Sequence, residues 1–425
     1  MIQALLETFA VDERVRVAAL RAAERCESFR YPAQAHVKAA ILRAFHDEDV
    51  HDSDLAGSTG YGYDDAARAR YESLLARVFD VERALARLSI VSGTHAIVTA
   101  LAALVPSGKT LLSVTGRPYD TLRNAICDAP FSLVSQGIAY REIALADDGG
   151  VDVDAVVDAV RDPNVAAVFV QRSRGYAPRP SLTIAACEEL FDAIKAVAPD
   201  VMILVDNCYG ELVERREPTH VGADLVMGSL IKNLGGSIAP TGGYVAGRAS
   251  LIEQVAARLY APGLSDALGP SLGFGRAFVQ GLFVAPLIVE QTLRGLDFAA
   301  ALFEELGFPV DPKPGETRTD IVQAIRLGNA GLLRRFAEGL QRAMPLNASF
   351  RPEPGPVPGY VDPVIMSSGA FVAGATIELS CDAPLRPPFE VYLQGGIVAE
   401  HALLGAIFAS EAVVREGGRL TTEKL

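Results

Sequence analysis

Short apolar runs alternate with longer segments of helical periodicity between about residues 85 and 250. The runs are too short and too rich in β-branched residues to be helices, so they predict strands. They are LLSVT (111–115), VAAVFVQ (165–171), VMILVD (201–206) and DLVMGS (224–229). Around them, helices are predicted at 94–105, 152–161 and 181–197. This alternation predicts a parallel sheet with helices on both faces, and such sheets bind ligands at the carboxyl ends of their strands.

The pattern changes on either side of this region. Residues 1–24 read as one amphipathic helix, and FHDEDVHDSD (45–54) reads as an acidic loop. A mainly helical segment is predicted at 276–308. Beyond it, AFVAGATIELS (370–380) has the partial alternation of a strand, and a final helix is predicted near 397–414.

The length of the chain bears on its domain organisation. With 425 residues, half of them hydrophobic, the chain is too long for one small core. We therefore expect an N-terminal helical segment (1–60), a large domain (61–295) and a smaller C-terminal domain (296–425).

Composition and charge exclude several kinds of partner. The net charge is −13, which disfavours nucleic acid because an acidic chain repels phosphate backbones. A membrane is not expected, since there is neither a signal-peptide core nor a run of 18 apolar residues. Five dispersed cysteines without a CxxC pair favour the reducing cytoplasm. His46 and His51 lie in the acidic loop but lack the spacing of metal ligands, so we expect a solvated loop and no metal.

Two polar features coincide with predicted element ends. Ser92, Gly93 and Thr94 open a helical run, where hydroxyls and free N–H groups could bind an anion, although Ser-Gly-Thr is also an ordinary helix cap. Asp206 ends an apolar strand, where a buried carboxylate must find a cation or several donors. A structural salt bridge is the alternative for Asp206.

Lys232 is a third feature, because it is the one charged residue in GSLIKNLGGSIAPTGGYVAG (228–247). Such a lysine is either a surface side chain with a buried stem or an amine needed for chemistry. Desolvation among Gly, Leu and Ile would lower the pKa of the amine, which favours Schiff-base chemistry. We therefore predict a lowered pKa for Lys232.

These features together are the parts that pyridoxal phosphate requires. A lysine holds the aldehyde as an imine, and an aspartate keeps the pyridine nitrogen protonated so that the ring accepts electrons. Tyr119, in GRPYDTL (116–122), could face that ring or could be a core tyrosine. A nicotinamide-dependent dehydrogenase needs GxGxxG after a strand, and GSTGYG (57–62) has the wrong order and no strand before it. A non-catalytic binding protein is a further alternative, which the intact Lys232 and Asp206 disfavour.

Longer motifs follow one another along the chain from about residue 50 to 410. They are STGYGYDD (58–65), SGTHA (92–96), GRPYDTL, QRSRGY (171–176), VDNCYGE (205–211), GADLVMGSLIKN (222–233), TGGYVAGR (241–248), APGL, QGLF and IELS. Through them the sequence resembles the methionine gamma-lyase family, whose members are often named cystathionine beta-lyase-like or aluminium-resistance proteins. The resemblance implies an α/β, fold-type-I pyridoxal-phosphate enzyme, with a large mostly parallel sheet domain and a smaller α+β C-terminal domain.

The resemblance also implies roles for the cofactor residues. Lys232 matches the lysine that carries pyridoxal phosphate, and Asp206 matches the partner of the ring nitrogen. Tyr119 matches the stacking ring and, with Lys232, is expected to act in catalysis. The residues that match the phosphate cradle are Ser92, Gly93, Thr94 and Ser229.

Other residues are implied in contacts with a second subunit and with the substrate. Tyr61 or Tyr63 would reach the phosphate of a neighbouring subunit, which implies a homodimer or homotetramer with shared sites. Arg386 is the candidate for the substrate carboxylate because only arginine offers a planar bidentate fork. Arg172 and Arg174 are its rivals.

Positions beside these motifs depart from the family pattern. Leu88-Ser89 stands where a proline-glutamine pair is usual, and Leu234 stands where a proline usually follows the lysine-asparagine pair. Leu287 and SSGAFVAG (367–374) differ as well. We therefore expect a carbon–sulfur lyase type of enzyme that performs β- or γ-elimination on an amino acid with a side-chain leaving group. The alternative is a divergent enzyme that makes a specialised amino acid by γ-elimination or γ-replacement.

Overall fold

The computed structural model describes residues 1–422, with side chains as far as Glu416. The chain forms two compact units. The larger unit is Ala33–Pro286, and the smaller unit combines Met1–Pro32 with the chain from Leu287 onward. The domain boundaries predicted from the sequence stay a prediction, because compact units within one chain do not test which segments fold independently.

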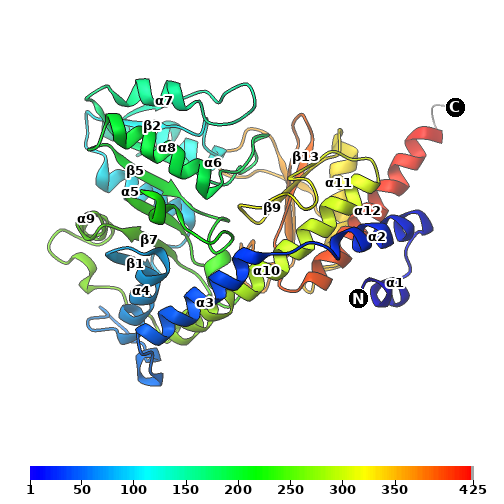
Figure 1. Cartoon of the computed structure of the whole chain (residues 1–425), viewed down its shortest axis with the longest axis horizontal. Helices are drawn as coiled ribbons and strands as arrows, with labels where there is room; N and C mark the ends of the chain where they lie inside the picture. The colour runs from blue at the N-terminus through cyan, green and yellow to red at the C-terminus, as the bar shows by residue number, and fades with distance from the viewer. Residues whose placement is uncertain (423–425) are drawn as a thin grey trace. The chain divides into compact units, whose positions relative to one another are not determined.

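A seven-stranded sheet forms the centre of the larger unit (Figure 1). In spatial order its strands are β1 (Arg83–Arg87), β7 (Gly243–Gly247), β6 (Leu225–Ser229), β5 (Met202–Asp206), β4 (Val165–Gln171), β2 (Thr110–Ser113) and β3 (Ala139–Glu142). All pairs from β6 to β3 are parallel, and only β7 runs antiparallel to its two neighbours. The predicted mostly parallel sheet is therefore confirmed.

Both faces of this sheet are covered. Phe169, Leu204 and Met227 belong to the core that α5 and α9 complete, and they are fully buried. Their neighbours Val168 and Val205 point to the opposite face and are fully buried as well. Each such side chain contributes roughly 1.5–3 kcal/mol by leaving water. The central strands therefore hold their carboxyl ends in fixed positions.

Helices and short turns connect the strands of the larger unit. The helices are α3 (Pro32–Asp47), α4 (Ala66–Phe79), α5 (Gly93–Leu104), α6 (Asp120–Arg123), α7 (Val153–Val160), α8 (Ile184–Val197) and α9 (Ala249–Leu259). The short turns are η1 (Asp52–Leu55), η2 (Asn124–Asp128), η3 (Val134–Gln136), η4 (Pro218–Val221), η5 (Asn233–Gly235) and η6 (Ser265–Ala267). The three helices predicted between 94 and 197 correspond to α5, α7 and α8.

The parallel registers place polar residues side by side at one edge of the sheet. Gln171, the last residue of β4, lies opposite Asp206, the last residue of β5. Asp206 in turn lies opposite Met227 of β6, which ends at Ser229. This edge is where a parallel sheet binds its ligands.

The smaller unit is built around a six-stranded antiparallel sheet. Its strands in spatial order are β10 (Pro354–Gly355), β11 (Val364–Ser368), β12 (Ser380–Pro384), β13 (Glu390–Gln394), β9 (Val322–Arg326) and β8 (Val310–Asp311). Its helices are α1 (Ile2–Thr8), α2 (Glu13–Cys26), α11 (Ala330–Gln341) and α12 (Ala399–Thr422). The long helix α10 (Gly275–Glu305) runs through the boundary between the units and confirms the helix predicted at 276–308.

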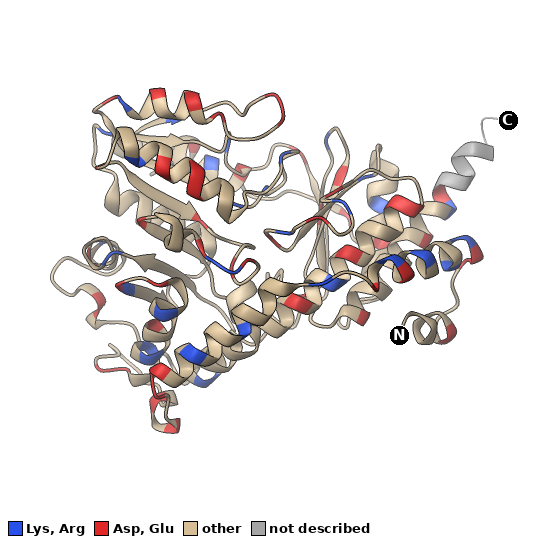
Figure 2. Cartoon of the chain, in the orientation of Figure 1, with Lys and Arg blue, Asp and Glu red and all other residues tan. Residues whose placement is uncertain are grey.

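Charged residues lie on helices and on the loops between them (Figure 2). Acidic and basic residues are interspersed along α2, whereas α8 carries three acidic residues and one lysine. No helix within residues 1–422 is long and apolar enough to cross a membrane.

Three predictions of elements were wrong in whole or in part. The acidic loop predicted at 45–54 is shorter, because α3 continues to Asp47 and η1 begins at Asp52. Residues 1–24 form two helices, because the Asp12 carboxylate accepts a hydrogen bond from Arg14 N and starts α2 anew. AFVAGATIELS forms turns, and only its last residue, Ser380, belongs to a strand. There the Glu378 carboxylate accepts hydrogen bonds from the backbone N–H groups of Phe371 and Val372, which a strand would have paired with a neighbour.

Candidate active site

Asp206 lies at the carboxyl end of β5 with 4% of its surface exposed. Its Oδ1 accepts a hydrogen bond from Cys208 N at 3.1 Å. Burial raises the pKa of this carboxyl group, and the charge of Lys232 only partly opposes the shift. Among the described residues no cation forms a direct ion pair with Asp206, so the salt-bridge alternative lacks support. A buried carboxylate of this kind suits a partner that brings its own N–H group.

Lys232 lies in the loop that joins β6 to β7 and is half-buried. Its Nζ is 3.8 Å from the centroid of the Tyr209 ring. Burial lowers the pKa of the amine. Cys208, Tyr209 and Asp206 raise it by more than burial lowers it, so the pKa lies well above the ordinary value of 10.5. The predicted lowered pKa was therefore wrong, because the sequence around Lys232 does not reveal the acidic groups that follow β5.

Tyr119 is held at both its hydroxyl and its backbone. The hydroxyl shares a hydrogen bond with Thr94 Oγ1 at 2.7 Å, and Tyr119 N donates to Gln171 Oε1 at 3.0 Å. Burial and then Asp206 raise the pKa of the phenol well above 10, so the group is neutral. The ring also packs partly against the hydrophobic core, as the alternative of a core tyrosine predicts. The contacts nevertheless join Tyr119 to the start of α5 and the end of β4.

The start of α5 meets the end of β6. The Ser92 hydroxyl accepts a hydrogen bond from His95 N at 3.1 Å and so caps α5. A Cβ atom at Gly93 would lie 2.9 Å from Cys208 Sγ and 3.6 Å from Ser229, so only glycine fits without displacing a neighbour. Ser229 is buried, and its hydroxyl accepts a long hydrogen bond from Ile231 N at 3.4 Å. Hydroxyl groups beside a helix N-terminus fit the phosphate of a cofactor.

The three arginine candidates have different surroundings. Arg172 is fully buried, and its guanidinium donates to Asn207 Oδ1 at 2.8 Å and pairs with Glu214 at 2.6 Å. These contacts occupy the group and disfavour it as a substrate ligand. Arg174 is also buried, and its backbone N donates to Ser181 Oγ. Arg386 lies in the smaller unit between β12 and β13, where it is partly exposed and its NH1 is 3.9 Å from Asp362 Oδ2.

The tyrosine and histidine candidates from the N-terminal part of the chain lie on the surface of the larger unit. Tyr61 and Tyr63 are 74% and 55% exposed, with ring centroids 5.9 Å apart. His46 and His51 are exposed, each beside an aspartate carboxylate. No group of three potential metal ligands occurs among residues 1–422.

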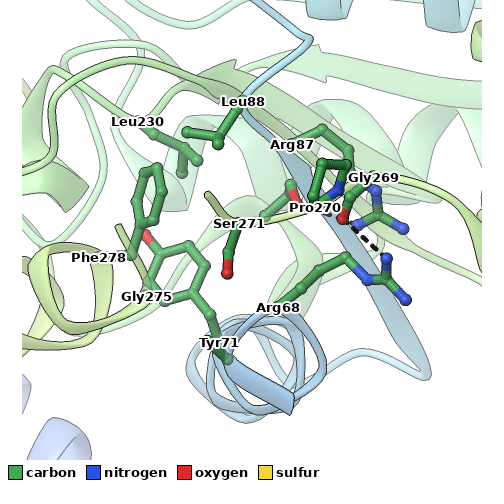
Figure 3. Close-up of a pocket in the computed structure, with 12 residues that line it drawn as sticks. Arg68, Tyr71, Arg87, Leu88, Leu230, Gly269, Pro270, Ser271, Gly275 and Phe278 are labelled. Atoms are coloured by element: carbon green, nitrogen blue, oxygen red, sulfur yellow. Dashed lines mark hydrogen bonds between the residues drawn. The ribbon is translucent and has the colours of Figure 1, made fainter. Parts of the chain in front are cut away.

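Leu88 lines a small pocket in the larger unit, together with Leu230, Tyr71 and Phe278 (Figure 3). The cavity measures about 20 Å³, which is room for roughly one water molecule. At its rim the Arg68 guanidinium donates a 2.8 Å hydrogen bond to the carbonyl oxygen of Gly269. The unusual leucine at position 88 is thus part of an apolar lining.

Four residues near the site escaped the sequence reasoning. Gln171 orients Tyr119, and Cys208 and Tyr209 face Lys232. Asn233 Nδ2 donates to the carbonyl oxygens of Tyr209 and Glu211, which fixes the turn after β5. Their positions in the sequence could have identified them, because each of the four is at a strand end or within three residues of Asp206 or Lys232.

A family model for methionine gamma-lyase matches residues 16–414. The chain belongs to this family. Membership makes it an enzyme of the pyridoxal-phosphate-dependent lyase class, and the mostly parallel sheet agrees with that fold.

Several known proteins are similar over most of the chain. Uncharacterized protein YnbB of Bacillus subtilis (strain 168) is 43% identical over 365 residues, which is 85% of this chain and 86% of the relative. A crystal structure from Clostridium acetobutylicum, named as a candidate cystathionine beta-lyase involved in aluminium resistance, is 38% identical with a TM-score of 0.93. It covers 97% of this chain and 98% of its own. A carbon-sulfur lyase involved in aluminium resistance from Clostridium novyi NT is 37% identical with a TM-score of 0.91, covering 96% and 98%.

Proposed function

We propose that this family member is a carbon–sulfur lyase that carries pyridoxal phosphate on Lys232. It removes a β- or γ-leaving group from an amino acid. The observation that carries the proposal is the position of Asp206, Lys232 and Tyr119 around the carboxyl edge of the sheet, where Asp206 is buried at the end of β5 and Tyr119 is held by Thr94 and Gln171. The names of the two clostridial relatives support the carbon–sulfur chemistry.

Pyridoxal phosphate, when bound, supplies an aldehyde for covalent attachment and a ring that accepts the electron pair released at Cα. The side chains of the enzyme position the reacting groups and transfer protons. Lys232 Nζ takes the proton from Cα and, for a γ-leaving group, a second proton from Cβ. The buried Asp206 carboxylate would hold the protonated ring nitrogen of the cofactor, and Tyr119, whose hydroxyl is held by Thr94, would support the ring. The whole reaction consumes one water and yields a thiol, ammonia and a 2-oxo acid.

The substrate and subunit contacts belong to the same proposal. Arg386 binds the substrate carboxylate, since Arg172 is occupied by buried partners. Tyr61 or Tyr63 reaches the site of a second subunit, in a homodimer or homotetramer, which their exposure in this chain permits. Five unpaired cysteines, three of them buried, support a reducing, cytoplasmic setting.

A panel of amino acids tests the reaction. Substrates with thiol or thioether groups on Cβ or Cγ are incubated with the purified enzyme, and thiol, ammonia and 2-oxo acid are each measured. We expect all three products in equal amounts without an added keto acid, and no product from the Lys232→Ala variant. Methionine itself is expected to be a poor substrate, given the departures at Leu88, Ser89, Leu287 and 367–374. If turnover requires a keto-acid acceptor, the enzyme is an aminotransferase and the lyase proposal is wrong.

The divergent alternative predicts instead that a nucleophile added to the γ-substrates is incorporated into a new amino acid.

A further inference from the structure

We propose that Tyr209 is a positioning residue for Lys232: the face of its ring holds the protonated amine and so sets how strongly that amine keeps a proton. The inference rests on the proposed function in one respect, since it is there that Lys232 acts as the base.

The contact between the two side chains has the geometry of a cation over an aromatic face. Lys232 Nζ is 3.8 Å from the centroid of the Tyr209 ring, well inside the ~6 Å over which such attraction acts. Both residues are half-buried, so water screens the contact less than it would at the surface.

The backbone at Tyr209 is held in an unusual conformation to make this contact. Its φ is +72°, a left-handed value that a bulky side chain adopts only at a cost in free energy. Asn233 keeps it there, because its Nδ2 donates to the carbonyl oxygens of Tyr209 (3.0 Å) and Glu211 (2.8 Å). Asn233 is fully buried and directly follows Lys232. One side chain therefore fixes both the ring and the start of the lysine loop.

Other titratable groups also face the amine, but most are neutral near pH 7. Burial raises the pKa of the Cys208 thiol and of the Tyr119 phenol well above their ordinary values, so neither carries charge. Burial raises the pKa of Glu211 to about 8, so its carboxyl group is mainly protonated. Asp206 is the remaining acid. The ring face of Tyr209 attracts the ammonium whatever its neighbours' protonation, because the attraction comes from the π-system.

The Tyr209 ring also acts on Lys232 during the catalytic cycle. When Lys232 Nζ has taken a proton from the substrate, it carries a positive charge that needs a partner. The Tyr209 ring offers that partner without accepting the proton. Tyr209 thus stabilises the protonated form of the base and keeps its proton close to the reacting carbons.

The test compares rings of the same shape and opposite charge distribution. Tyr209→Phe keeps the negative ring face, Tyr209→pentafluorophenylalanine reverses it, and Tyr209→Leu removes it. In each cofactor-free, full-length protein, the pH dependence of acetylation of Lys232 by acetic anhydride is followed by peptide mass mapping, which gives the pKa of its amine. Circular dichroism and the urea midpoint check that each variant is folded.

We expect wild type and Tyr209→Phe to titrate alike. The pentafluorophenylalanine and leucine variants should titrate about 0.4–1.5 pH units lower, the equivalent of a cation–π contact. At a fixed pH below the pKa this is a roughly 2.5- to 30-fold faster modification. The inference is overturned if the pentafluorophenylalanine variant matches Tyr209→Phe, or if Tyr209→Phe behaves like Tyr209→Leu, which would assign the effect to the hydroxyl group. Because cofactor and substrate are absent, these outcomes are separate from success or failure of the proposed lyase reaction.

Discussion

Glu211 makes the stability of the larger unit depend on pH near neutrality. It follows the turn after β5 and is fully buried. Its Oε1 accepts a 2.9 Å hydrogen bond from the Tyr244 hydroxyl, and its Oε2 has no hydrogen-bond partner among the described residues. Burial, and then the charge of Glu217, raise its pKa from 4.5 to about 8. A glutamine at this position keeps the acceptor for Tyr244 and cannot ionise.

The magnitude follows from the difference in proton binding between the two states. In the unfolded chain Glu211 loses its proton near pH 4.5, whereas in the folded protein it keeps the proton to about pH 8. The folded state therefore binds more protons in this window, and stability falls as pH rises. The contribution of Glu211 is fully present below pH 4.5 and is lost as pH rises through 8. At about 1.36 kcal/mol per pH unit, the loss between pH 6 and pH 8 is about 2 kcal/mol.

The assay is urea unfolding of wild type and Glu211→Gln at intervals between pH 6 and pH 8. We expect the wild type to lose about 2 kcal/mol more than the variant across this range, because only the wild type has this proton to release. Glu253→Gln, on the exposed side of α9, controls for the loss of one negative charge and should follow the wild type. Parallel pH profiles for wild type and Glu211→Gln would refute the reasoning.

Three further predictions concern the site. Asp206→Asn should keep the fold by circular dichroism and most of its bound cofactor by absorbance, but lose roughly 10²–10³-fold in kcat, as removal of a preorganised charge partner does elsewhere; near-normal turnover would contradict its role. Gly93→Ala places a Cβ atom 2.9 Å from a buried sulfur, and crowding of about 1–3 kcal/mol should weaken pyridoxal phosphate binding by roughly 5- to 150-fold in a fluorescence titration; unchanged affinity would remove Gly93 from the cradle. Mixing Lys232→Ala with inactive Tyr61→Phe or Tyr63→Phe protein should restore about a quarter of the activity after random exchange in a dimer, and no recovery despite demonstrated subunit exchange would argue against shared sites.

Much of the sheet could be predicted because its central strands are buried on both faces. Such strands appear as continuous apolar runs, and VAAVFVQ matches β4 at both ends. The antiparallel course of β7 had no such signal, since its direction depends on the loop that contains Lys232. The strand predicted at AFVAGATIELS failed because a buried glutamate carboxylate, Glu378, satisfies the backbone locally.

The candidate site, like the sheet, was predicted only in part from the sequence. Asp206 and Lys232 could be recognised because each is a charge in an apolar setting. The raised pKa of Lys232 could not, because its cause is the turn after β5, which is distant in sequence. Tyr209 was missed for a related reason: its contact depends on a left-handed backbone held by Asn233, and neither conformation nor hydrogen bond is visible in residue types.

The central claim is that Lys232 carries the cofactor, and covalent labelling tests it most directly. The full-length protein is loaded with pyridoxal phosphate, reduced with borohydride and mapped by peptide mass spectrometry. Lys195→Ala, which removes an amine that pairs with Asp224 at 3.0 Å, serves as the matched control and should still be labelled. We predict one pyridoxyl group on the peptide that contains Lys232, and none in Lys232→Ala. A label on another lysine, or the same labelling in Lys232→Ala, would contradict the claim.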